Sequence, residues 1–280
     1  MPGDTSAEAL TGRFGADGLR RFGPAAGPAA GLVLPLQVGP YFHTLEEEPA
    51  LLPEYADLLE EELADPGQRS WARIGSDRAY DLVVDPGGEV RALLIGYREE
   101  PLKYVNSSAA AFAAGLLGLD LLLDTLGSED PQLAAAEFHR FEEQLRAADP
   151  AAFADRESWW PLVLDDIRDT SATEWYAAFE VVDEAGAKEI FTSSGAVCIH
   201  PEERLWARLE AAGVEPDQVV RIFTELQACN LPGHYCSMWL ALTFPDAEVT
   251  HSFDYGESAA SREQGIRELR AAAAERAGGA

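Results

Sequence analysis

The sequence predicts an α+β domain over residues 32–168 and a three-layer α/β domain over residues 170–280, after a flexible lead-in over residues 1–31. The chain has 280 residues, of which 47% are hydrophobic, and this length favours two domains over one. The first region combines a hairpin pattern with long helix patterns. The second follows the order strand–strand–helix–strand–helix–strand–helix. The lead-in is rich in Gly, Ala and Pro, which is typical of loosely packed chain.

The first folded region contains a predicted hairpin. Strands over residues 80–84 and 89–97 flank the sequence Asp85-Pro-Gly-Gly, which favours a chain reversal. A further strand is predicted over residues 72–74. The predicted helices of this region span residues 54–64, 108–126, 131–147 and 156–168.

The second region alternates strands and helices. Aromatic and β-branched residues mark its first strand, and Leu205 and Leu209 repeat at helical spacing in its first helix. The predicted strands span residues 174–182, 189–192, 217–223 and 248–253. The predicted helices span residues 200–212, 232–244 and 257–276.

The formal net charge is -28, from 49 acidic and 21 basic residues, and both regions carry an excess of acidic side chains. Binding to duplex DNA requires clustered Lys and Arg that neutralise phosphates, so this composition argues against such a groove. The charge has two readings. It provides solubility alone, or it suits a small substrate or a basic protein partner.

No apolar segment reaches the roughly 18 residues that a membrane-spanning helix needs. Residues 109–127 are rich in Ala, Leu and Gly, but Asp120 and Asp124 interrupt them, so we expect a buried helix. The N-terminal residues lack the basic-then-apolar order of a signal peptide. We therefore expect a cytoplasmic protein that has no membrane partner.

The chemistry-bearing residues of the chain lie in the second region. His200-Pro-Glu202 is followed by Cys229 and Cys236, and these residue types are the components of a catalytic zinc site. One imidazole and two thiolates hold Zn²⁺ and leave its fourth position to a water molecule, whereas four protein ligands mark a structural site. The Glu is not a ligand; it carries protons between that water and the substrate.

The local sequence indicates how these side chains would meet. Proline is favoured in the first helical turn, so Pro201 places His200 at a helix N-cap and Glu202 in the first turn. Cys229 follows a predicted strand, and Cys236 lies in the first turn of the next helix. The helix dipole favours thiolates at such a position. Two helix N-termini would therefore converge on one metal ion.

Several residues in this region have alternative interpretations. The two cysteines are six residues apart instead of two, and Ala228 stands where proline is usual, but a loop with Pro232 and Gly233 can double back. Cys198 is a small core residue or a fourth ligand that would make the site structural. The substrate-contact candidates are His234, Asp254 and Tyr255, although loop and turn positions explain them as well.

Residues 171–280 resemble the nucleic acid/nucleotide deaminases of bacterial polymorphic toxin systems. The resemblance rests on His200–Cys236, on the motif Thr-Glu-Leu-x-x-Cys at residues 224–229 and on Tyr235-Cys236 after a lengthened loop. It implies a zinc-dependent, cytidine-deaminase-like fold that acts on a nucleotide or a single-stranded nucleic acid. The residues it carries over are the zinc ligands His200, Cys229 and Cys236 and the proton shuttle Glu202.

The first region is similar to the SUKH superfamily, in its fourth immunity-protein group. The similarity rests on Leu34-Pro-Leu-Gln-Val-Gly-Pro-Tyr-Phe42, Arg73-Ile-Gly-Ser76 and Tyr104-Val-Asn-Ser-Ser108. Members of this superfamily are α+β binding modules, and many neutralise toxins by direct binding. The resemblance implies that an acidic N-terminal domain binds a basic toxin protein.

Three functions follow as hypotheses. The first is an active nucleobase deaminase with an SUKH-like recognition domain, in a bacterial toxin and immunity system. The second is a non-catalytic immunity or binding protein whose deaminase-like half is scaffold. The third is a structural zinc protein, which has no need of Glu202.

Overall fold

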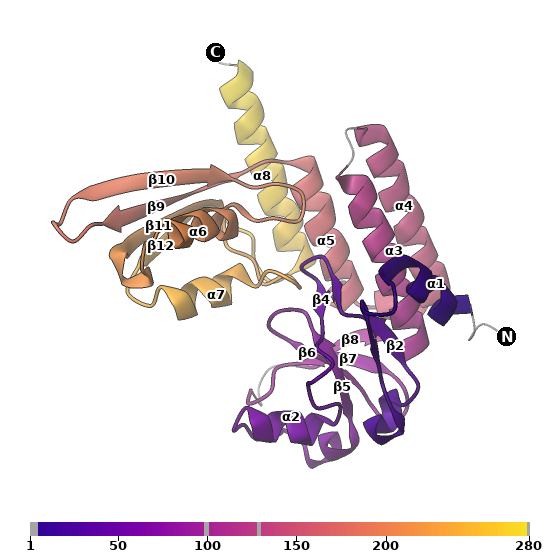
Figure 1. Ribbon diagram of the computed structural model, residues 1–280. Helices are drawn as coiled ribbons and strands as arrows, with labels where there is room; N and C mark the ends of the chain where they lie inside the picture. The colour runs from indigo at the N-terminus through magenta and orange to yellow at the C-terminus, as the bar shows by residue number, and fades with distance from the viewer. Residues whose placement is uncertain (1–4, 98–100, 128–129, 279–280) are drawn as a thin grey trace. The chain divides into compact units, whose positions relative to one another are not determined.

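The computed structural model describes residues 5–97, 101–127 and 130–278 (Figure 1). The chain divides into two compact units, Met1–Leu164 and Asp165–Ala280. The division falls inside helix α5 (Trp159–Ala172), a few residues before the predicted boundary at 168–170. The helix continues across the division without a linker. The sequence therefore contains no loop-forming segment that would mark the boundary.

The first unit is built on a six-stranded antiparallel sheet. The strand order is β3-β4-β5-β6-β7-β8, so each strand pairs with its neighbour in sequence. The hairpin of β6 and β7 confirms the predicted reversal at Asp85. The strands are β3 (Gln37–Val38), β4 (Phe42–His43), β5 (Ala72–Ser76), β6 (Asp81–Val84), β7 (Val90–Leu93) and β8 (Lys103–Asn106).

The segment predicted to be a flexible lead-in is ordered and packed from residue 5 onward. It contains α1 (Thr5–Phe14) and β1 (Leu19–Arg21), and β1 pairs antiparallel with β2 (Val33–Pro35). Leu10 and Leu19 are each only 1% exposed. These large side chains anchor the segment, although small residues dominate its composition. Residues 1–4 lie outside the described residues.

The helices of the first unit mostly follow the predicted ranges. The helix predicted over 54–64 is shorter, because Glu60 adopts a left-handed backbone conformation (φ 59°) after its last turn. Ser108 caps α3 by accepting a bond from the Ala111 N–H at 3.2 Å. The α-helices are α2 (Leu52–Leu58), α3 (Ala109–Leu126), α4 (Pro131–Ala148) and α5; short 3₁₀ segments are η1 (Pro24–Ala29), η2 (Pro66–Ser70) and η3 (Pro150–Phe153).

Helix α3 is the one described helix that is long and apolar enough to cross a membrane. The core helix of a soluble protein has the same length and composition. Its side chains at Phe112, Leu116 and Leu119 are fully buried within the first unit. The expectation that no apolar segment reaches this length was wrong, and the expected burial holds for 33% of the helix. The helix is compatible with a soluble protein.

The second unit contains a four-stranded mixed sheet in the order β10-β9-β11-β12. β9 pairs antiparallel with both β10 and β11, and β11 pairs parallel with β12. The strands are β9 (Tyr176–Val182), β10 (Lys188–Ser194), β11 (Val219–Leu226) and β12 (Glu248–Phe253). The remaining elements are α6 (Pro201–Ala211), η4 (Pro216–Gln218), α7 (Cys236–Thr243) and α8 (Ala259–Gly278). This element order is the predicted one.

One face of this sheet carries the hydrophobic core of the second unit. Ala177, Phe179 and Val181 alternate along β9 and pack in one cluster with side chains from α6 and α7. α8 lies against the ends of β11 and β12. A side chain at Gly265 would place its Cβ 2.0 Å from the carbonyl oxygen of Asp254, so only glycine permits this approach. The packing brings the N-terminal ends of α6 and α7 to the same end of the sheet (Figure 1).

Candidate metal centre and active site

Three predicted ligands meet inside the second unit. The Nδ1 atom of His200 lies 3.5 Å from Sγ of Cys229 and 3.3 Å from Sγ of Cys236, and all three residues are buried. A tetrahedral zinc ion with bonds of about 2.3 Å to sulfur and about 2.0–2.1 Å to nitrogen requires nitrogen–sulfur separations of roughly 3.6 Å. The donor set and the spacing therefore fit such an ion.

His200 is positioned by the start of α6. It is the N-cap residue, with an extended backbone (φ -75°, ψ 145°), and Pro201 occupies the first helical position. Only 3% of His200 is exposed, and its ring makes an edge contact with Trp175 at a centroid distance of 5.7 Å. The helix start and the contact with Trp175 thus hold the imidazole inside the unit.

The six residues between the cysteines form a tight reversal. Gly233 (φ 83°) and Tyr235 (φ 46°) both adopt the left-handed conformation, so the helix predicted over 232–244 begins only at Cys236. The Ser237 N–H then donates to the carbonyl oxygen of Cys229 at 2.9 Å. This bond ties the first turn of α7 to the end of the preceding strand and brings both sulfurs to His200.

Glu202 lies beside the three predicted ligands but is not part of their group. Its Oε1 atom is 4.0 Å from His200 Nδ1, and only 2% of the residue is exposed. Its Oε2 atom is buried and has no hydrogen-bond partner among the described residues. Burial raises the pKa of its carboxyl, which suits a group that both accepts and releases a proton. A buried acceptor without a partner is costly, so this atom fits a water molecule at the metal's fourth position.

A carboxylate that the sequence interpretation missed orients the histidine. Asp166 of α5 accepts from Nε2 of His200 at 2.8 Å, which leaves Nδ1 as the metal-facing nitrogen. Its other oxygen lies 3.2 Å from Nε2 of His234. The only sequence signal was Asp165-Asp166 on a helix, because the histidine partner lies 34 residues away.

His234 belongs to this supporting network and does not line the central cavity. Its ring stacks on that of His200 at a centroid distance of 4.0 Å and an angle of 7°. Its Nδ1 bonds Oε2 of Glu203 at 2.7 Å. Two carboxylates therefore hold the two stacked rings, one of which belongs to the predicted metal ligand His200. The predicted contact between His234 and substrate stays a prediction.

The charges of the site are strongly coupled. Burial opposes ionisation of Cys229, but a hydrogen bond from Cys236 and the nearby His200 outweigh it and hold the pKa of Cys229 well below its usual value. Burial and then Cys229 raise the pKa of Cys236 well above its usual value. Burial would lower the pKa of His200, but Cys229 and Asp166 raise it. The lowered pKa of Cys229 favours its thiolate, which is the form of cysteine that binds a metal ion.

The remaining predicted residues fall in different places. Tyr255 lines the cavity and is 5% exposed; its hydroxyl donates to Asp169 at 2.8 Å. Asp254 has an 89% exposed side chain and bonds His251, and it does not line the cavity. Cys198 is outside the ligand group, and its N–H donates to Thr170 Oγ1 at 3.1 Å. The alternative in which Cys198 is a fourth ligand is therefore not supported by its position.

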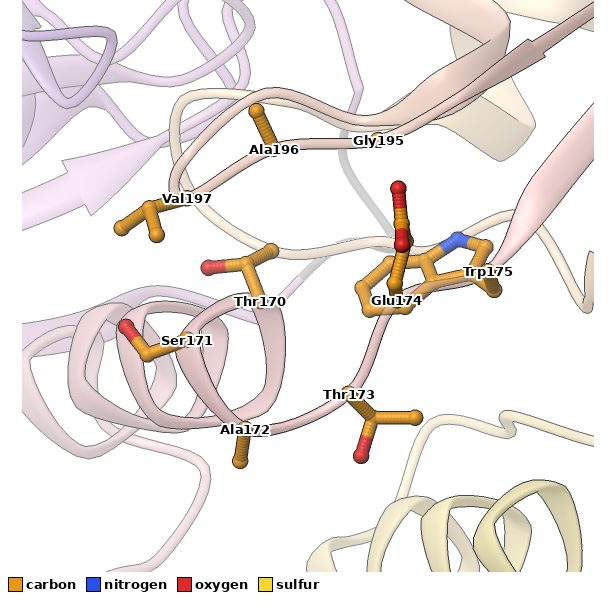
Figure 2. Close-up of a pocket in the computed structure, with 9 residues that line it drawn as sticks. All are labelled: Thr170, Ser171, Ala172, Thr173, Glu174, Trp175, Gly195, Ala196 and Val197. Atoms are coloured by element: carbon orange, nitrogen blue, oxygen red, sulfur yellow. The ribbon is translucent and has the colours of Figure 1, made fainter. Parts of the chain in front are cut away.

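The cavity at the centre has a volume of about 10 Å³, roughly the room that one water molecule needs. A larger cavity of about 410 Å³ has Trp175 in its wall as well. Figure 2 shows this larger cavity between the loop at Gly195–Val197 and the end of α5 at Thr170 and Ser171. Its size lies in the range of small-molecule pockets. Trp175 therefore stands between the site and a space large enough for a ligand.

Comparison with known families gives one match for each half of the chain. The family model for SUKH-4 immunity proteins matches residues 5–166, and that for Xanthomonas-like deaminases matches residues 172–272. No curated protein and no solved structure matches the chain. Both resemblances inferred from the sequence are confirmed. Asp166 is the last residue of the first match and lies outside the second.

Proposed function

The chain belongs to the SUKH-4 immunity protein family through residues 5–166 and carries a deaminase domain over residues 172–272; from this premise we propose that it is a zinc-dependent nucleobase deaminase. The substrate class we propose is a nucleotide or a single-stranded nucleic acid. The setting is a bacterial toxin and immunity system in the cytoplasm. The supporting observation is the buried group of His200, Cys229 and Cys236 with Glu202 beside it.

The residues present fit Zn²⁺ in number, type and spacing. His200, Cys229 and Cys236 would hold the ion, and the structure describes no fourth ligand within their group. A zinc ion in such a site supplies hydroxide at neutral pH, because it lowers the pKa of bound water to about 7. In the second unit, α6 and α7 cover one face of the sheet; the proposed three-layer, cytidine-deaminase-like arrangement also needs a helix such as α8 on the other face.

Glu202 would carry the protons of the hydrolysis. Its carboxylate accepts a proton from the attacking water and donates it to the ring nitrogen next to the amino-bearing carbon. It then transfers the second proton to the departing amino group, which leaves as ammonia while the carbonyl forms. The chain's contribution is a buried site in which this carboxyl is held 4.0 Å from His200 Nδ1.

Substrate binding requires the cavity to enlarge. A nucleobase is several times larger than the water molecule that about 10 Å³ accommodates, so a base cannot enter beside the ligands as they stand. Trp175 and Tyr255 both line this cavity, and Trp175 also lines the larger one. We propose that displacement of Trp175 joins the two spaces when a base binds.

A second function is favoured by the match that covers more than half of the chain. SUKH-4 proteins are immunity proteins by description, and the first unit supplies most of the net negative charge. A non-catalytic protein that binds a basic toxin would also fit these observations, with the second unit as scaffold. We propose the basic partner for the first unit under either function.

A substrate panel distinguishes the two functions. Zinc content and ammonia release are measured on one preparation against nucleosides, nucleotides, single-stranded DNA and RNA. Deamination by a preparation with about one zinc ion per chain is the expected result. A zinc-loaded protein that is inert toward the whole panel would contradict the enzyme and leave the binding protein.

Cys229→Ser is expected to lose bound zinc. A hydroxyl is a far weaker zinc ligand than a thiolate, and metal binding also contributes to folding stability. The measurements are zinc stoichiometry by elemental analysis and the melting temperature with and without a chelator. Cys198→Ser is the matched control, because Cys198 lies outside the ligand group and should keep the metal.

A further inference from the structure

A concave surface at the edge of the second unit's sheet carries two arginines without acidic partners. Arg204 and Arg208 lie four residues apart on α6 and are both exposed. They line a pocket of about 570 Å³ together with Tyr176, Thr192, Ser193 and Ser194. Arg204 donates one bond, to the carbonyl oxygen of Ser194 at 3.3 Å. We call this surface the arginine pocket.

Most arginines of this unit have an acidic partner. Arg168, Arg221 and Arg262 each form an ion pair with a carboxylate, as do Arg267 and Arg276. Arg270 instead donates to the hydroxyl of Thr173 at 2.6 Å. Neither Arg204 nor Arg208 has a carboxylate partner within the part of the chain that the structure describes. In a protein of charge -28, two adjacent unpaired guanidinium groups indicate a place for an external anion.

Tyr176 also lines the pocket, at the strand edge; its side chain points to the face of the sheet opposite α6, because the neighbouring Ala177 faces the core. Tyr176 is 40% exposed, and its ring contacts that of Phe223 at a centroid distance of 5.6 Å. Phe223 braces the tyrosine from the sheet, which leaves part of the ring to solvent. Three hydroxyl-bearing residues complete the lining. Guanidinium, hydroxyl and aromatic groups together are the combination that binds phosphates and unstacked bases.

The arginine pocket is next to the proposed active site along the chain. Tyr176 and Ser194 line the pocket, whereas their neighbours Trp175 and Gly195 line the cavity of about 410 Å³. Successive side chains of a strand point to opposite faces. Trp175 therefore lines the cavity of about 410 Å³, and Tyr176 lines the arginine pocket. No residue lines both the arginine pocket and the metal cavity.

We propose that the arginine pocket binds the phosphodiester backbone of a single-stranded nucleic acid whose target base enters the metal site. Arg204 and Arg208 contact phosphates, and Tyr176 stacks on a neighbouring base. This inference rests on the proposed deaminase function and names its substrate class. The arginine pocket and the metal cavity have no lining residue in common. We therefore assign the phosphate in the pocket and the target base to different nucleotides of one polymer.

The test measures binding apart from catalysis. Full-length protein with Glu202→Ala is titrated into fluorescent single-stranded DNA or RNA of about 12 nucleotides, and anisotropy is recorded over a range of salt concentrations. Arg204→Gln with Arg208→Gln is expected to weaken binding about tenfold. The slope of log affinity against log salt should become less steep by about 1.4, since single strands lose about 0.7 per phosphate contact.

Two further comparisons separate charge and stacking. Arg140→Gln with Arg267→Gln removes the same charge from arginines that have carboxylate partners, and it should leave both the affinity and the slope unchanged. Tyr176→Ala should weaken binding about tenfold, whereas Tyr176→Phe should retain it, because the ring stacks and the hydroxyl does not.

The outcomes distinguish this inference from the proposed function. Equal loss in the Arg204/Arg208 and Arg140/Arg267 variants would overturn the phosphate site. Failure to bind either oligonucleotide, with turnover of free nucleotides by the wild type, would also overturn it and leave the deaminase intact. Arginine-dependent binding without any ammonia release would support the site and contradict the enzyme.

Discussion

Glu202→Ala protein is expected to retain about one zinc ion per chain and to release ammonia at least about 10²–10⁴-fold more slowly than the wild type. Zinc should remain because Glu202 lies outside the group of His200, Cys229 and Cys236. The reaction should fail because the substitution removes the group that we propose as the proton carrier. Zinc content by elemental analysis and ammonia release by a coupled assay are measured on the same sample.

The matched control for this prediction lies on the same helix. Glu210→Ala removes an exposed carboxylate from α6 and should preserve both zinc and turnover. Glu202→Gln keeps the size of the side chain and should be as inactive as Glu202→Ala. Full activity in Glu202→Gln would show that another group moves the protons, whereas loss of zinc in that variant would make Glu202 a ligand.

Asp166→Asn is expected to lower the affinity for zinc by about 10- to 100-fold, the usual cost of losing the carboxylate behind a metal-bound histidine. Asp166 accepts from His200 Nε2 at 2.8 Å and also faces His234. An asparagine amide in its place presents either a donor or a weaker acceptor to Nε2 of His200. It therefore holds the imidazole less firmly in the orientation that points Nδ1 at the two cysteines. Affinity is measured by competition with a chromophoric chelator.

Asp169→Asn provides the comparison within the same helix. Asp169 is also a buried carboxylate of α5, but it bonds Tyr255 and Arg168 and neither histidine. Asp169→Asn should lower folding stability about as much as Asp166→Asn, because both replace a buried carboxylate of α5. The melting temperature of each variant, measured after a chelator has removed the metal, reports this loss. Equal zinc affinities for the two variants would refute an orienting role for Asp166.

The position of Asp166 also bears on how the two families are joined. It lies in the part of α5 that packs with the second unit, yet the deaminase match begins only at residue 172. Asp165 of the same turn pairs with Arg262, and Asp169 accepts from Tyr255. The helix at the end of the SUKH-4 match thus supplies three buried carboxylates to the deaminase unit.

Sequence reasoning identified the metal group because its signals are local. Residue type determines which side chains bind zinc, and Pro201 after His200 sets a helix start without reference to the rest of the chain. The strands and helices of the second unit were also predicted, because hydrophobic periodicity is read within a short window. The ranges differ where left-handed residues end or delay a helix, as at Glu60 and Tyr235.

The tertiary structure alone decided which distant groups complete the site. Asp166 and His200 are 34 residues apart, and no pattern of residue types pairs a carboxylate with a particular ring nitrogen over that separation. The sequence did not predict the packing of residues 5–31 for a related reason. Their few buried leucines stabilise the segment by contacts with elements that are distant in the sequence. Sequence determined the donors and their local conformation, because these depend on chemistry and backbone preference. Long-range packing decided the tautomer of His200, the burial of Glu202 and the size of the cavity. These depend on contacts between residues that are far apart in the sequence.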